Sequence, residues 1–278
     1  MTAEQSLREG RVEDALSELQ QQVRNDPARS DLRVFLFQLL SVMGQWDRAL
    51  NQLSVAGEMD ASTLAMVQTY RSAVQCEPLR QGVFAGKKSP LFFGEPEEWM
   101  ALLVQAVSLE AVGKHAEAQA TRDRAFELAP TTSGTIGGES FSWISDADPR
   151  LGPMLEVVLN GKYYWVPFHR IHQIVTEEPV DLRDVVWTPA YFTWSNGGTS
   201  VGLIPSRYPG TEQSADGAIR LGRKTDWAEV PGGAYHGIGQ RMLATDAGEY
   251  PLLELRMITL DTLEVGVELP EAGAESGE

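Results

Sequence analysis

The sequence predicts an α+β protein, with helices in its first half and a mainly antiparallel sheet in its second. A helical pattern recurs with a period of 34 residues before residue 130, and β-branched and aromatic runs separated by turn residues follow it. At about 150 residues per domain, the 278 residues allow two domains. We expect a helical domain at 1–130, a strand-rich domain at 131–262 and an acidic disordered tail at 263–278.

The helical repeat is marked by glycine and proline. The segment that begins at Gly10 is echoed at Gly44, 34 residues later, and again at Gly113. Pro27 and Pro130 each follow their glycine by 17 residues. Glycine lets the chain turn between two antiparallel helices, and proline ends the second one. This pattern is the signature of the tetratricopeptide repeat, and a plain helical bundle is the alternative.

Apolar residues at helical spacing place the individual helices. Leu16, Leu19 and Val23, for example, fall on one stripe. The predicted helices are 3–9, 12–25, 30–43, 46–56, 61–76, 96–112 and 115–128.

The first helix of each pair would present side chains to a shallow groove. The candidates are Val34, Gln38 and Val42 from one pair, with Leu103 and Val107 from the later pair. Such a groove usually accepts a helix or an extended peptide of another protein. We therefore expect partner binding at these five residues.

Turn residues predict three hairpins in the second half. Asn160-Gly161 separates strands at 154–159 and 162–166, and Asn-Gly supplies the positive backbone angles of a two-residue turn. In the last strand, Leu253, Leu255 and Met257 alternate with charged residues, which predicts one buried and one exposed face. The other two hairpins pair 185–194 with 199–204 and 240–245 with 250–260. The aromatic residues expected in the core are Tyr163, Tyr164, Trp165, Trp187, Phe192, Trp194 and Trp227.

The charge balance excludes two classes of partner. The chain has 23 Lys and Arg against 39 Asp and Glu, a net charge of −16, which repels nucleic acids and anionic membranes. The most apolar window, 34–43, is half the length of a membrane span, and the first ten residues do not resemble an export signal. The only cysteine, Cys76, fits a reducing compartment, and with Glu77 beside it we expect a structural thiol.

Motifs of common enzymes are incomplete in this sequence. The segment 82–89 is one residue short of a phosphate-binding loop, and Ser140 lacks the second glycine of a hydrolase elbow. Asp146 and Asp148 are closer to an Asp-led turn that pairs with Arg150 than to a catalytic pair. We expect neither a cofactor nor enzyme activity.

A metal-dependent hydrolase is the alternative from another functional class. It would use His169 and His172, with His236 and Asp226 joining them in space. Residues three apart on a strand face opposite sides, so partly exposed histidines with local hydrogen bonds are the simpler interpretation. A third interpretation makes the second half a surface for self-association.

Several long segments resemble one known family. Residues 141–153, FSWISDADPRLGP, resemble the opening of the ImpE-like domain, also called TagJ, of accessory proteins in bacterial type VI secretion. The likeness continues through 161–168, 181–187, 207–212, 225–227, 237–242 and 249–255.

The resemblance implies a cytoplasmic, non-enzymatic component associated with the contractile sheath. The expected partner is the small sheath subunit, of which the protein would bind one helix. Through this contact it would modulate sheath assembly or disassembly by the ClpV-type ATPase. No binding residue follows from the family motifs themselves, whose aromatic positions look like core and turn positions.

Overall fold

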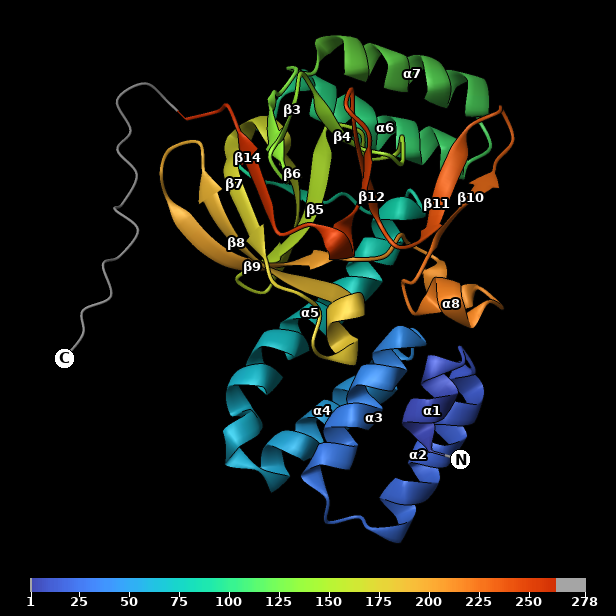
Figure 1. Ribbon diagram of the computed structural model, residues 1–278. Coiled ribbons are helices and arrows are strands. Elements are labelled where there is room, and N and C mark those ends of the chain that lie inside the picture. The colour runs from blue at the N-terminus through green and yellow to red at the C-terminus, as the bar shows by residue number, and fades with distance from the viewer. Residues whose placement is uncertain (1, 264–278) are drawn as a thin grey trace, which may run out of the picture.

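Helices form the first half of the chain and strands the second in the computed structural model, which describes residues 2–263 (Figure 1). Apart from Leu263, the tail expected at 263–278 lies outside the described residues. The helices are α1 (Ala3–Arg8), α2 (Val12–Asn25), α3 (Ser30–Val42), α4 (Trp46–Met59), α5 (Leu64–Phe84), α6 (Glu98–Ala111), α7 (His115–Leu128) and the short α8 (Gly217–Arg220).

The three repeat glycines end the first helix of each pair, as predicted. Gly10, Gly44 and Gly113 have φ angles of +76°, +65° and +78°, a region that suits glycine. The residue after each glycine donates its backbone N–H to the carbonyl of the residue five positions before it. The donors are Arg11, Gln45 and Lys114, at 2.8, 2.9 and 3.0 Å. This Schellman-type cap satisfies a helix-end carbonyl and turns the chain into the second helix.

The long helix α5 was predicted to end at residue 76, and that prediction is wrong. The segment begins with a short 3-10 turn at Ala61–Thr63, and α5 then continues through Pro78 to Phe84. Glu77 and Arg80 form an ion pair within this part of the helix, with 3.5 Å between Nη1 and Oε2. Figure 1 shows why the extra length matters, because α5 runs from the lower helices to the sheet.

The main sheet has nine strands in the order β1-β6-β5-β9-β8-β7-β14-β2-β3. Its pairs are antiparallel except that β1 runs parallel to β6, and β1 comes from the helical half, where no strand was predicted. A second sheet has the order β13-β12-β4, and a separate hairpin pairs β10 with β11. The strands are β1 (Leu91–Phe92), β2 (Gly134–Ile136), β3 (Glu139–Phe141), β4 (Ile144–Asp146), β5 (Met154–Leu159), β6 (Lys162–Pro167), β7 (Ile171–Thr176), β8 (Trp187–Trp194), β9 (Thr199–Pro205), β10 (Thr225–Glu229), β11 (Tyr235–Gly239), β12 (Met242–Thr245), β13 (Glu249–Pro251) and β14 (Met257–Leu260).

Two predicted hairpins form as whole units, and the third forms only in part. β5 pairs with β6 around Asn160-Gly161, and β8 pairs with β9. β12 pairs with β13, but after Pro251 the chain makes a 3-10 turn and resumes as β14 in the other sheet. The predicted alternation holds at Leu255, which is buried between two exposed charged residues. It is wrong at Met257, which is 52% exposed, whereas Ile258 is buried.

Strand β5, third in the order of the main sheet, is buried on both faces. Leu155, Val157 and Leu159 contribute to a core within the strand-rich half. Met154 and Val158 contribute to a larger core that also contains residues of α1 to α7. That larger core crosses the predicted boundary at residue 130, so the helices and the sheet stabilise one another.

The predicted aromatic core residues divide between these two cores. Tyr163, Trp165 and Trp187 pack against the helices, and the Trp187 ring lies 5.9 Å from that of Trp46. Phe192 and Trp194 stack within the strand core, with ring centroids 5.0 Å apart. Tyr164 and Trp227 are only half-buried.

A buried ionic cluster joins α5 to the sheet. Glu156 of β5 accepts from Arg80 Nε at 2.7 Å and from Nη2 at 3.0 Å, and it also pairs with Arg241. Arg241 also forms an ion pair with Asp146 of β4. Burial opposes the charge of Glu156, but Arg80 and Arg241 outweigh it and hold the pKa of this carboxyl at about 2. Tyr163 donates its hydroxyl proton to the same carboxylate.

Arginines of the strand-rich half also bind helix ends of the first half. Arg207 donates from Nη1 to the carbonyl of Val42 at 3.0 Å and from Nη2 to that of Ser41 at 3.4 Å. Arg223 donates to the carbonyls at the end of α1, at 2.8 and 2.9 Å. These contacts satisfy carbonyls that a helix C-terminus leaves without intrahelical partners.

Replacing one member of the buried cluster should destabilise the whole protein. Arg80→Leu leaves Glu156 paired with Arg241 alone. It also removes the ion pair that Glu77 forms with Arg80. We expect a loss of about 3–5 kcal/mol in the free energy of unfolding, measured by chemical denaturation. Arg124→Leu, which breaks an exposed pair with Glu127, should be about as stable as wild type. Equal stability of the two variants would contradict this account.

Candidate functional site

The first candidate surface is a hollow beside α3. It has a volume of about 430 Å³ and adjoins a second hollow of about 470 Å³ that shares Glu4, Asp31 and Phe35 with it. Both are open to solvent. We call the first the α3 surface, and its lining includes Glu4, Asp31, Val34, Phe35, Gln38, Asp60 and Asp181.

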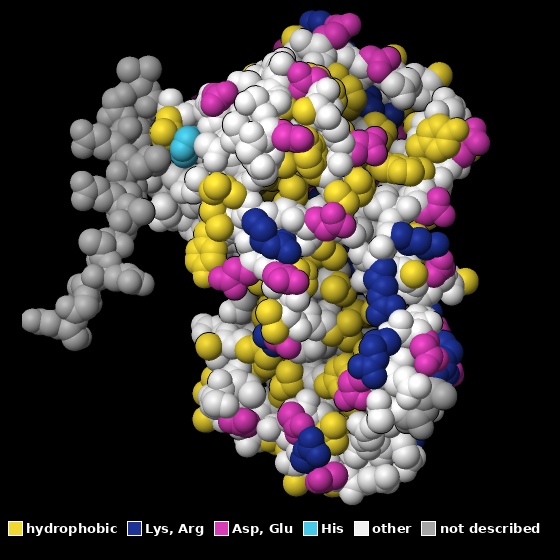
Figure 2. All heavy atoms as spheres, viewed as in Figure 1, with side chains coloured by type: hydrophobic (Ala, Val, Ile, Leu, Met, Phe, Trp, Pro, Cys, Tyr) yellow, Lys and Arg dark blue, Asp and Glu magenta, His cyan; other side chains and the backbone are white. Residues whose placement is uncertain are grey.

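The α3 surface combines apolar side chains with acids. Asp31, Val34 and Gln38 are spaced three and four residues apart, so they lie on one face of the helix. Its charged lining residues are all acidic, and they come from α1, α3, the turn after α4 and the loop before β8. Figure 2 shows hydrophobic side chains exposed among acidic and basic ones over the lower helices on the face it draws.

The five residues predicted to line one groove do not meet in the structure. Val34 and Gln38 lie together at the α3 surface. Val42, Leu103 and Val107 are buried in the larger core, with exposed fractions of 3% or less. The long α5 separates the pair α3–α4 from the pair α6–α7, which lies at the opposite end of the molecule (Figure 1). Partner binding at Val34 and Gln38 stays a prediction.

The structure does not assemble the alternative metal site. His169 Nε2 lies 3.2 Å from Glu97, and His172 Nδ1 lies 2.9 Å from the carbonyl of Leu260. His236 Nε2 lies 2.5 Å from Glu110 Oε1 on α6. Within residues 2–263, no group of three or more His, Cys, Asp or Glu side chains is placed to hold a metal ion.

Glu110 anchors the hairpin β10–β11 to the helical pair α6–α7. It pairs with His236 of β11 and, at 2.5 Å, with Arg122 of α7. Burial disfavours its ionised form, but His236 and Arg122 together lower its pKa to about 2. The histidine that sequence analysis grouped with a metal site thus lies against a glutamate that is also paired with Arg122.

The predicted turn at Asp146 and Asp148 is confirmed. Asp148 accepts from the backbone N–H of Arg150 at 2.9 Å and from Arg150 Nη2 at 2.5 Å. Asp146 accepts from the backbone N–H of Asp148 at 2.8 Å. Burial raises the pKa of Asp146 to about 6 against the opposing charge of Arg241. Both carboxylates therefore have structural partners.

Cys76 has the environment predicted for a structural thiol. Its Sγ lies 3.7 Å from the carbonyl of Gly161, in the turn between β5 and β6. Burial, and to a smaller degree Glu77, raises the pKa of this thiol to about 11. Little reactive thiolate exists at neutral pH.

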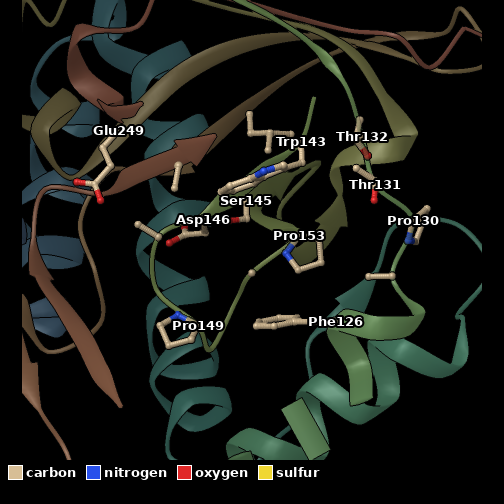
Figure 3. Close-up of a pocket in the computed structure, with 15 residues that line it drawn as sticks. Phe126, Pro130, Thr131, Thr132, Trp143, Ser145, Asp146, Pro149, Pro153 and Glu249 are labelled. Atoms are coloured by element: carbon tan, nitrogen blue, oxygen red, sulfur yellow. The ribbon is translucent and has the colours of Figure 1, made fainter. Parts of the chain in front are cut away.

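A further hollow, which sequence analysis missed, lies between the end of α7 and the small sheet. Its volume is about 460 Å³. In Figure 3, Trp143 and Phe126 lie on opposite sides of Pro153. The available signal was Trp143 itself, a large aromatic residue in a short segment rich in small and polar residues. We call this hollow the β4 pocket, and its lining includes Phe126, Pro130, Trp143, Ser145, Asp146, Pro149, Pro153, Ala244 and Glu249.

Comparisons with known proteins agree with this architecture. A family model described as ImpE protein matches residues 138–259, and a tetratricopeptide-repeat model matches residues 6–72. The chain is 52% identical over 263 residues to the type VI secretion system accessory component TagJ of Pseudomonas aeruginosa. The aligned region covers 94% of this chain and 92% of that relative. The chain belongs to the ImpE family.

A solved structure supports the same fold for this ImpE protein. The crystal structure of a Vibrio parahaemolyticus protein superposes with a TM-score of 0.84 at 25% identity, covering 93% of this chain and 97% of that one. The first half is therefore TPR-like, and the second is mainly antiparallel sheet. The similarity to TagJ supports an accessory role in type VI secretion. None of the helices between residues 2 and 263 has the length and apolar character that crossing a bilayer requires.

The ion pairs of Glu110 should make part of the stability pH-dependent. The ordinary pKa is 4.5 and the folded value is about 2, so the stabilisation is complete above pH 4.5 and is lost as the pH falls toward 2. Glu110→Gln should cost about 2 kcal/mol at pH 7. The difference between wild type and Glu110→Gln, measured by urea denaturation from pH 7 to pH 3, should shrink over the acidic part of this range. A constant difference would show that Glu110 is not ionised in these pairs.

Proposed function

We propose that this ImpE protein is a non-enzymatic adaptor of a type VI secretion system that binds a helix of the small sheath subunit at the α3 surface. Through this contact it modulates assembly of the contractile sheath or its disassembly by the ClpV-type ATPase. A sheath partner places the protein in the cytoplasm. The alternative hydrolase has no support from the positions of its histidines.

The α3 surface is the observation that carries this proposal. Val34 and Phe35 are only partly buried, so their apolar side chains remain available to a partner. A helix with one apolar stripe can place it against such a hollow, as peptides do in helix-binding grooves. Asp31 and Asp181 are paired with Arg29 and Arg183. Glu4 and Asp60 have no ion-pair partner among residues 2–263, and their charge favours a partner helix with Lys or Arg beside its apolar stripe.

The accessory role of the relative supports the absence of catalysis. TagJ is named as an accessory component, and this chain matches it over almost its whole length. The buried titratable groups that could attract attention as catalytic residues, Glu156, Asp146 and Asp148, all have arginine partners. Their arrangement fits the maintenance of the fold.

Placing a charge in the α3 surface should weaken binding of the small sheath subunit. Val34→Asp puts a carboxylate where the partner's apolar stripe would lie, and it adds to the acidic charge already there. We expect at least about a tenfold increase in Kd, measured by calorimetry with the purified subunit. The matched control is Val201→Asp on β9, where the wild-type side chain is 62% exposed and lies outside the α3 surface. Both variants should keep the circular dichroism spectrum of the wild type.

Salt provides a second readout of the same contact. If acids of the α3 surface attract a basic partner, the association rate should fall as ionic strength rises. Unchanged affinity of Val34→Asp would refute the α3 surface as the binding site. An association rate that does not depend on salt would refute the electrostatic part of the proposal.

A further inference from the structure

The β4 pocket has a floor of small side chains. Ser145 of β4 pairs in register with Ala244 of β12, and Ala244 pairs with Glu249 of β13. Residues in such a cross-strand row point to the same face of a sheet. Ser145 and Ala244 fill little space on this face, so the hollow above them remains open, and Glu249 lies at its outer end.

Two aromatic side chains form the walls of the pocket without being buried by it. Trp143 is 40% exposed, and Phe126 of α7 is 39% exposed. Gly152 allows Phe126 to approach the turn after β4, because a Cβ at this glycine would lie 2.4 Å from the ring. Exposed aromatic rings around a hollow are typical of binding surfaces, where a partner can cover them.

The charges at the pocket are all of one sign. Its lining contains Asp146 and Glu249 but neither lysine nor arginine. Asp146 is buried, and its charge is balanced by Arg241. Glu249 is exposed, and the structure shows it in no ion pair with any residue between 2 and 263. The pocket therefore presents one uncompensated carboxylate beside an aromatic, proline-rich hollow.

We propose that the β4 pocket is a second protein-binding site, which accepts a segment of a partner with an apolar side chain next to an arginine. The apolar side chain packs against Trp143, Pro153 and Phe126, which line the hollow. The arginine pairs with Glu249, and its aliphatic stem lies along the floor. The volume of about 460 Å³ is within the range of pockets that bury small ligands.

This site is separate from the α3 surface and shares no lining residue with it. The proposal thus goes beyond the adaptor function above, since it adds a second recognition element in the strand-rich half. A chain with both sites can hold two segments at once, either of one partner or of two, and linked contacts bind more tightly than either alone.

The test uses the full-length protein labelled with 5-fluorotryptophan, which gives a ¹⁹F NMR signal for each of the seven tryptophans. Trp143→Phe assigns the Trp143 signal by its disappearance. The probe is the capped peptide acetyl-Gly-Leu-Arg-Leu-Gly-amide, titrated into the millimolar range. We expect the Trp143 signal to shift with saturation while the other six tryptophan signals stay in place.

Two comparisons separate the charge from the apolar contact. A peptide with glutamine in place of arginine should bind more weakly, and Glu249→Gln should raise the Kd of the arginine peptide by about two- to fivefold. Glu178→Gln, an exposed acid outside the pocket lining, is the matched control and should leave the Kd unchanged. Val34→Asp should also leave it unchanged, so failure of this proposal and failure of the sheath-binding proposal are distinguishable.

Three outcomes would overturn the proposal. One is a Trp143 signal that does not move with the arginine peptide. Another is an equal response to the glutamine peptide, which would remove the role of the positive charge. The third is a Glu249→Gln variant that binds the arginine peptide as tightly as the wild type does.

Discussion

The fold depends on a single buried carboxylate with arginines on both sides. Glu156 is a charged residue in the most buried strand, and it is tolerated there because Arg80 of α5 and Arg241 of the loop before β12 surround it. An unpaired charge at this depth would cost several kcal/mol, so the helix and the small sheet are held to β5 in one arrangement. The ionic cluster fixes the orientation of α5 and the small sheet relative to β5, while the apolar core on either side supplies most of the stabilisation.

This constraint explains the structural role of the segments that resemble the ImpE domain. Asp146, Tyr163, Arg207 and Arg241 come from four different segments that resemble the ImpE domain, and they meet around Arg80 and Glu156. Their roles are ion pairs, hydrogen bonds to backbone carbonyls and turns. The resemblance therefore identifies the family partly through residues that maintain its fold. The same segments also supply Trp143 and Glu249 of the β4 pocket, whereas the α3 surface is formed mainly by residues before position 64.

The two open surfaces belong to different halves but have similar chemistry. Each combines partly exposed apolar side chains with acids, in keeping with a net charge of −16. Because the larger core contains both helices and strands, the two surfaces are held by one framework. A partner bound at one of them therefore has a defined position relative to the other, which is a useful property in an adaptor.

The sequence by itself determined the elements that depend on local interactions. Gly10, Gly44 and Gly113 marked the helical hairpins, and Asn160-Gly161 marked a strand turn, because positive φ angles restrict the choice of residue. Tertiary contacts decided the rest. The ion pair of Glu77 and Arg80 lies beyond the predicted end of α5, and the register of β14 reversed the burial expected near Met257. Assembly of the larger core enclosed Leu103 and Val107. Periodicity identifies an apolar face, but only the assembled neighbours determine whether that face meets a core or a partner.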